Sequence, residues 1–151
     1  MCRHILSAGL LLTLAAFPLA GCADPVTERD PRVELEASAS VVDDVLIVEG
    51  SATVPDGARI DYQLDEPLAD LPDEAAFAGG NAIVSDESFT FEEPVTGLAT
   101  DEVNVWISFQ TPGQPVEIVA LYGEAGENIE SDNVVEVEDI RRVEIEFTVP
   151  R

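Results

Sequence analysis

An alternation of apolar and polar residues with a period of two is the feature that most limits the fold of this sequence. In residues 33–39 the odd positions are apolar and the even positions are Glu or Ser, and the pattern returns in residues 60–64, 103–109 and 143–149. Successive side chains of a strand point to opposite faces, so each segment predicts a strand with one buried face. Apolar runs at residues 45–48, 116–121 and 134–137, and the pair Phe89 and Phe91, predict further strands.

Turn signals separate these segments at short intervals. One is the sequence Pro-Asp-Gly at residues 55–57, and another is Thr-Pro-Gly-Gln-Pro at residues 111–115, between two predicted strands. Proline fixes φ and glycine accepts positive φ, as tight turns require. Residues 72–78 begin with proline and acids and precede two glycines, which predicts a short helical turn. The sequence therefore predicts an all-β fold, an immunoglobulin-like antiparallel β-sandwich of seven to nine strands with one short helical turn.

The N-terminus has the layout of a secretory signal peptide. Arg3 precedes an apolar run over residues 5–20, which is shorter than the roughly 20 residues that a membrane-spanning helix needs. The run ends in the sequence Leu-Ala-Gly-Cys at residues 19–22, which resembles the lipobox of bacterial lipoproteins. That resemblance implies cleavage before Cys22 and lipid on its sulfur, with two or three acyl chains that suffice for stable anchoring.

Three segments follow from this organisation. Residues 1–21 are the expected signal peptide, and residues 22–32 are a lipidated tether with two prolines and no apolar periodicity. Residues 33–151 are the expected β-sandwich domain. Their turn motifs and apolar positions are similar to small envelope β-sandwich domains of uncharacterised bacterial lipoproteins, a resemblance that carries no known activity. It is found at residues 48–50 (Val-Glu-Gly), 54–57 (Val-Pro-Asp-Gly), Phe89, 114–115 (Gln-Pro) and 123–128 (Gly-Glu-Ala-Gly-Glu-Asn).

Composition narrows the possible functions. The chain has 31 acidic residues against seven basic ones, a net charge of −24, and it contains no lysine. Cleavage before Cys22 would also remove the only histidine, His4, and the other cysteine, Cys2. This leaves no residues for His-dependent nucleophilic catalysis, Schiff-base chemistry, phosphate-binding loops or zinc and copper sites of the His and Cys type. Clustered carboxylates also repel nucleic acid and anionic lipid headgroups, although an acidic, lysine-free surface is equally typical of proteins adapted to high salt.

Two kinds of chemistry remain open for the domain. Paired carboxylates could hydrolyse a glycosidic bond, provided that a groove raises the pKa of one of them. Calcium is the second, because it prefers six to eight oxygen ligands. The richest candidate for a calcium site is the glycine-containing loop at residues 124–132, although its spacing differs from that of an EF-hand. Its candidate ligands are Glu124, Glu127, Asn128, Glu130 and Asp132.

Aromatic and edge residues complete the sequence-based expectations. Trp106 alternates with the apolar positions of its strand, so it either fills a second buried face, which we expect, or marks a partner surface. Tyr62 and Tyr122 are expected at the edge of the core with hydroxyls that reach water. The outer faces of the first and last strands carry glutamates that discourage aggregation between edges; they are Glu34, Glu36, Glu144 and Glu146.

These expectations combine into a leading hypothesis. The chain is a membrane-anchored, extracytoplasmic lipoprotein that is held in the cell membrane or outer membrane by the lipid on Cys22. Its domain is a non-catalytic, cofactor-free monomer that binds an envelope protein or has a structural role in the envelope. A carboxylate-dependent hydrolase and a calcium-binding module are the two alternatives.

Overall fold

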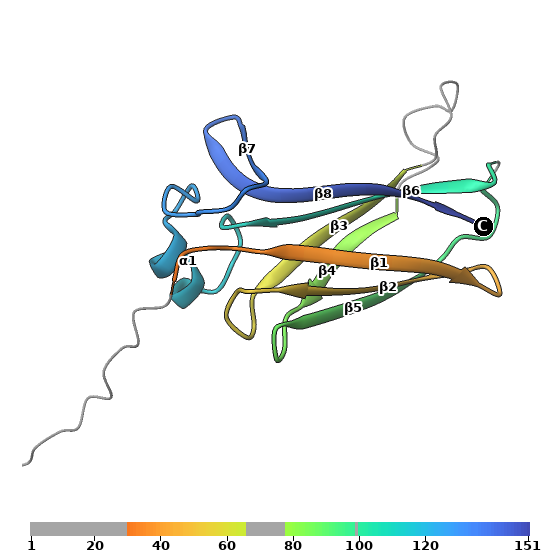
Figure 1. Ribbon diagram of the computed structural model, residues 1–151, viewed down its shortest axis with the longest axis horizontal. Helices are drawn as coiled ribbons and strands as arrows, with labels where there is room; N and C mark the ends of the chain where they lie inside the picture. Colours follow the sequence, from red (N-terminus) through yellow and green to blue (C-terminus); the bar gives the residue numbers. More distant parts are fainter. Residues whose placement is uncertain (1–29, 66–77, 99) are drawn as a thin grey trace, which may run out of the picture.

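Two antiparallel sheets pack face to face in a computed structural model that describes residues 30–65, 78–98 and 100–151 (Figure 1). The smaller sheet has the order β1-β2-β5, formed by β1 (Leu35–Val42), β2 (Val45–Ala52) and β5 (Ser88–Pro94). The larger sheet has the order β4-β3-β6-β8-β7, formed by β4 (Ala78–Ile83), β3 (Arg59–Asp65), β6 (Glu102–Gln110), β8 (Ile140–Pro150) and β7 (Val134–Val137). The expected antiparallel β-sandwich is confirmed, and its eight described strands fall within the predicted range.

Some predictions fall on residues outside the described ranges. They are the signal peptide, the lipidation site Cys22, most of the tether, and residues 72–77 of the predicted helical turn. The last residue of that predicted turn, Ala78, begins β4. Among the described residues, no helix is long and apolar enough to cross a membrane.

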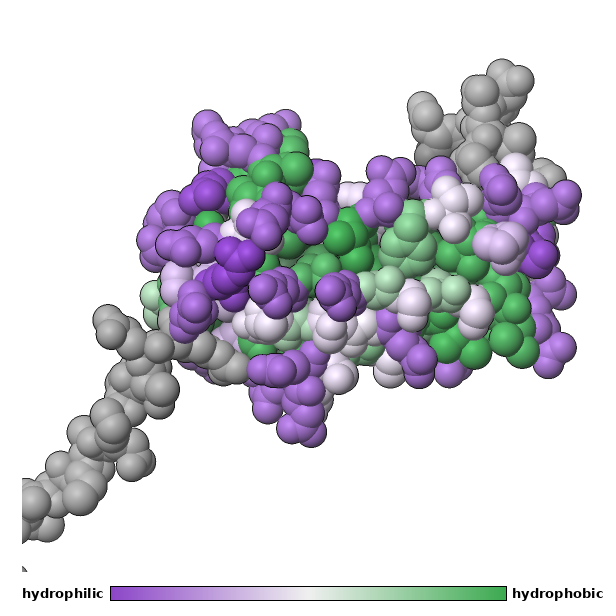
Figure 2. Space-filling view, in the orientation of Figure 1, coloured by the Kyte–Doolittle hydropathy of each residue, from purple (hydrophilic) through white to green (hydrophobic). Residues whose placement is uncertain are grey.

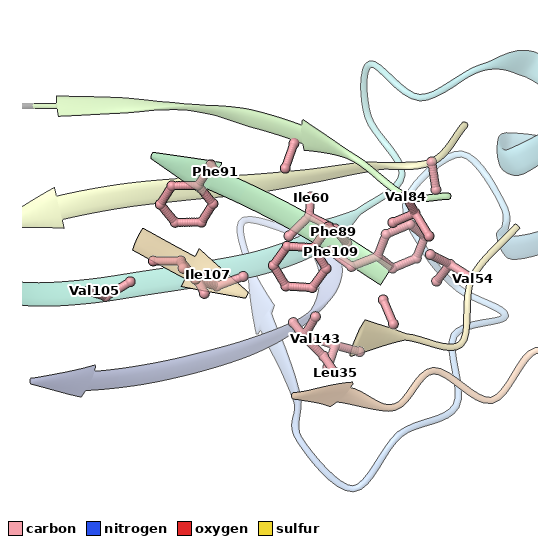
Figure 3. Close-up of a cluster of buried hydrophobic side chains, with 14 of the residues drawn as sticks. Leu35, Val54, Ile60, Val84, Phe89, Phe91, Val105, Ile107, Phe109 and Val143 are labelled. Carbon is pink, nitrogen blue, oxygen red and sulfur yellow. The ribbon is translucent and has the colours of Figure 1, made fainter. Parts of the chain in front are cut away.

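The hydrophobic core fills the space between the two sheets (Figure 3). β6 lies at the centre of the larger sheet, and its inward residues are each at most 1% exposed, as the period-two pattern predicts. Burial of a side chain of this size contributes roughly 1.5–3 kcal/mol, so this strand anchors the sandwich. The inward residues of β6 are Val103, Val105, Ile107 and Phe109, and they pack with side chains from both sheets such as Leu35, Ile60, Phe89 and Val143.

Three two-residue turns are made of acids. Two of them close the β1–β2 and β7–β8 hairpins, and the third lies between β4 and β5, which belong to different sheets. In each turn both residues have positive φ, which matches the right-handed twist of the flanking strands but favours Asn and Gly. Pairs of acids are unusual in this conformation, so the sequence offered no standard turn signal at these points. The turn residues are Asp43 and Asp44, Asp86 and Glu87, and Glu138 and Asp139.

The prediction of a strand at the apolar run of residues 116–121 is wrong. The structure places this run in a seven-residue helix, α1 (Val116–Tyr122), that follows the predicted turn at residues 111–115. Pro115 precedes the helix with φ preset near its helical value, and Gly123 follows it at φ +89°. Ile118 and Tyr122, four positions apart, are buried on one face, while Val116 is 79% exposed. An apolar run this short is compatible with a strand or a helix, and only the residues that flank it distinguish the two.

The two tyrosines have different environments. Tyr62 is half-buried as expected; its ring stacks on Phe91 of the other sheet at 3.7 Å, and its hydroxyl donates to Oε1 of Glu93 at 2.6 Å. The prediction for Tyr122 is wrong, because this residue is 0% exposed and meets Phe109 edge to face at 5.1 Å. The helix that the sequence did not predict turns Tyr122 into the core.

Candidate functional site

The loop that carries the predicted calcium ligands joins α1 to β7 and ties down the start of the domain. The main-chain oxygen of Glu130 accepts the N–H of Val33 at 2.7 Å, and Oδ2 of Asp132 pairs with Nη2 of Arg32 at 2.9 Å. The main-chain oxygen of Glu124 accepts the hydroxyl of Thr111 at 3.2 Å. These bonds hold the loop against the first described residues and against the end of β6.

The other two candidate ligands also have structural partners. Oε2 of Glu127 accepts the N–H of Ala125 at 2.9 Å, and main-chain hydrogen bonds, chiefly from Glu127 itself and Ala125, lower the pKa of the Glu127 carboxyl. The amide of Asn128 donates to the main-chain oxygen of Leu121 at 3.4 Å. In the described ranges, no group of three or more His, Cys, Asp or Glu side chains is placed to hold a metal ion.

Trp106 lies on the outer face of the larger sheet, half-buried, rather than in a second core. Its indole N–H donates to Oε2 of Glu144 at 3.2 Å, and the guanidinium of Arg142 lies 5.0 Å from the ring centroid. Nε of Arg142 donates to the same carboxylate oxygen at 2.8 Å. The three side chains therefore hold one another in place, in an arrangement that combines a cation–π contact with a shared acceptor.

A row of polar residues crosses three strands beside Trp106. Asp61 of β3 is opposite Ser108 of β6, and Ser108 is opposite Glu144 of β8. Desolvation raises the pKa of Asp61, although Gln110 donates to its Oδ2 at 3.0 Å and partly offsets the effect. The hydroxyl of Ser108 is buried and has no hydrogen-bond partner among the described residues.

This row is the arrangement nearest to a carboxylate-dependent hydrolase. Asp61 and Glu144 face each other across one strand, and Trp106 lies beside them. Glu144, however, already accepts two hydrogen bonds from neighbouring side chains. Ser108, between the acids, is 0% exposed and so out of reach of a bound substrate. Nothing in this geometry favours hydrolysis over a well-ordered sheet surface.

Part of β8 forms an open strand edge that the sequence did not predict. β8 has 11 residues, whereas its outer neighbour β7 has four and pairs only with the segment from Ile140 to Val143. Among the described residues, no strand pairs with that edge from Ile145 to Pro150. The sequence did contain a sign of this difference in strand length. The apolar segment at residues 134–137 has four residues, whereas the segment at residues 143–149 has seven.

The direction of the main-chain groups shows which residues face this free edge. The N–H of Glu144 points toward β7, where it meets the main-chain oxygen of Asn133 at 3.4 Å, whereas the N–H of Arg151 meets Asp101, which precedes β6, at 2.9 Å. Because main-chain groups alternate along an antiparallel strand, the even-numbered residues present theirs to the outer edge. Glu146 and Thr148 therefore present N–H and C=O groups to an edge where no described strand pairs with them.

Half-buried apolar side chains line the side of the sandwich below the free edge. β1, the edge strand of the smaller sheet, lies beside β8 here, and Figure 2 shows a hydrophobic band along this side between hydrophilic margins. Unpaired main chain and incompletely covered apolar side chains thus occur together, and we call this surface the β8 seam. Its apolar residues are Ala37, Ala39 and Val41 of β1 and Ile145 and Phe147 of β8.

No protein-family model matches the sequence, and no curated protein matches it.

Proposed function

We propose that this chain is an exported lipoprotein, anchored through Cys22 to the side of a membrane that faces away from the cytoplasm. We further propose that its β-sandwich is a non-catalytic module that binds another protein of the envelope. The anchoring is supported by the apolar run over residues 5–20 and by its end in Leu-Ala-Gly-Cys. With lipid on its only remaining cysteine, the module would rely on hydrophobic burial for its stability.

The β8 seam is the observation that carries the binding part of this proposal. An open strand edge is a template for pairing with another chain, and proteins usually shorten, charge or cover such edges. Here the edge extends from Ile145 to Pro150 and lies above the half-buried side chain of Phe147. Strand addition at such an edge provides main-chain hydrogen bonds for affinity and apolar contacts for specificity.

Metabolic labelling tests the anchor. The chain would be expressed in a bacterium grown with radiolabelled palmitate, alongside Cys22→Ala and a control, Cys2→Ala, in the predicted signal peptide. We expect label and membrane fractionation in the unaltered chain and in Cys2→Ala, and loss of both in Cys22→Ala. Equal fractionation of all three, without label, would refute the anchor.

Site-specific crosslinking tests the binding role. A photoreactive amino acid at Thr148, on the free edge, would be compared with one at Glu92, an exposed residue of β5 in the other sheet. We expect crosslinks to a discrete envelope protein from position 148 and none from position 92. Crosslinks of equal yield from both positions, or from neither, would contradict a role for the β8 seam.

A further inference from the structure

The strand β7 shows how a further strand could pair with the free edge of β8. β7 lies antiparallel to β8, with Val134 opposite Val143, and the preceding Asn133 is where the chain leaves this line. A hollow of about 290 Å³ lies at the point of departure, lined in part by Leu35, Glu36 and Asn133. A strand that continued the line of β7 along β8 would occupy the space between this hollow and Pro150.

The two faces of such a strand would meet different surroundings. Its inward side chains would cover Ile145 and Phe147 of β8 and the half-buried alanines of β1. Its outward side chains would be flanked by Glu144, which pairs with Arg142, and by the exposed Glu146; both lie on the outer face of β8. Opposite charges on neighbouring strands attract, and like charges directly opposite are destabilising.

From these surroundings we propose that the β8 seam binds an extended segment of another protein in which apolar residues alternate with Lys or Arg. The inference rests on the proposed function and specifies the chemistry of its partner. A net charge of −24 attracts basic segments over distances beyond direct contact. The same charge disfavours a second copy of this chain, because pairing β8 with β8 brings Glu144 and Glu146 of both copies together.

Peptide binding to the full chain in detergent with neutral headgroups tests the proposal. The probe is a capped peptide of alternating valine and lysine, and its control has glutamate in place of lysine. We expect binding of the lysine peptide only, measured by calorimetry, with slowed hydrogen exchange at the amides of Glu146 and Thr148. Absence of binding, equal binding of both peptides, or binding without protection of these amides would overturn the proposal.

Two matched pairs of variants separate charge from main-chain pairing. Glu146→Arg and Glu92→Arg change the net charge equally, and we expect only Glu146→Arg to weaken peptide binding, by about tenfold. Thr148→Pro removes an N–H that faces the free edge, a position where a strand tolerates proline. Thr148→Ala controls for loss of the hydrogen bond that the Thr148 hydroxyl donates to Oδ1 of Asn104 at 2.8 Å. We expect Thr148→Pro to weaken binding and Thr148→Ala to leave it unchanged.

Other results of these experiments would contradict the proposal or assign the β8 seam to a different partner. Equal weakening by both arginine variants would reduce the effect to net charge and overturn a specific edge, as would normal binding by folded Thr148→Pro. Concentration-dependent self-association that Thr148→Pro abolishes would assign the β8 seam to a second copy instead. Because palmitate labelling at Cys22 is measured separately, failure of the peptide would leave the anchor intact, and failure of the anchor would leave the peptide result intact.

Discussion

Substitution of Gly50 by alanine is expected to destabilise the sandwich, because the ring of Phe89 occupies the space beside this glycine. Gly50 lies on the inward side of β2 and pairs with Ala37 of β1 and Phe89 of β5. A Cβ there would lie 2.6 Å from Cε1 of Phe89 and 2.7 Å from the main-chain oxygen of Glu36, closer than real Cβ atoms approach. Either the ring or the paired strand must therefore shift.

The expected magnitude is a balance of two effects. Overpacking costs roughly 1–3 kcal/mol, and relief of the glycine's backbone entropy returns about 0.5–1 kcal/mol. We therefore expect Gly50→Ala to lower the free energy of unfolding by about 1–2 kcal/mol, a fall in melting temperature of roughly 3–10 °C. Urea and thermal denaturation, followed by circular dichroism, measure both quantities.

A double-mutant cycle tests the cause. Phe89→Leu frees space beside Gly50, so Gly50→Ala should cost less in that background, with a coupling of about 1 kcal/mol. If the effects of the two substitutions on the free energy of unfolding are additive within about 0.5 kcal/mol, the ring of Phe89 is not the cause of the destabilisation at position 50. A Gly50→Ala variant that is more stable than the parent would refute the packing argument altogether.

Further predictions concern ionisation, turns and cations. Desolvation and the Glu93 carboxylate raise the pKa of Tyr62 to about 12; its neutral form stabilises the fold fully below pH 10, and this contribution is lost as the pH rises to about 12. A spectrophotometric titration should show the shift, and Tyr62→Phe should remove it. The raised pKa of Asp61 means that its charge opposes folding at neutral pH, so Asp61→Asn should raise the melting temperature at pH 7 by about 1–3 °C, with the gain vanishing below pH 3. Glu138→Asn combined with Asp139→Gly suits the positive φ of this turn and should add about 1 kcal/mol to the free energy of unfolding in urea titrations. Calcium should raise the melting temperature no more than magnesium at equal ionic strength, because the carboxylates of Glu127 and Asp132 already have structural partners and no group of three or more acids among the described residues is placed to hold a metal ion; a selective calorimetric signal for calcium would contradict this.

The fold class was predictable because strand periodicity reports burial directly. The segments at residues 33–39, 60–64, 103–109 and 143–149 all alternate, and the apolar face of each is buried or half-buried in the structure. The helix α1 was missed because a run of six apolar-rich residues has no decisive period, and the preceding Pro115 also fits a turn between strands. The sheet order depends on contacts far apart in sequence, which local patterns do not contain.

The environment of single residues was less predictable. Trp106 was expected in a buried face, yet its half-buried position depends on Arg142 and Glu144, which lie one strand away and about 40 positions later in sequence. The β8 seam depends on the difference in length between two neighbours, and that difference becomes meaningful only once β7 and β8 are known to pair. From the sequence, Glu144 and Glu146 beside this seam were expected only to discourage aggregation between strand edges. The structure adds that they border an edge with unpaired main chain.

The position of the β8 seam is compatible with the proposed anchor. The described chain begins at the end of the sandwich that holds α1, and β8 runs from that end to the C-terminus at the opposite end (Figure 1). β7 covers β8 at the end near α1, so the free segment from Ile145 to Pro150 lies farthest from the start of the domain. A strand of this kind rises about 3.4 Å per residue, which adds roughly 20 Å over that segment. Lipid on Cys22 would therefore join the bilayer to the domain at the end where β7 covers β8, and the free edge would lie at the end away from this point of attachment.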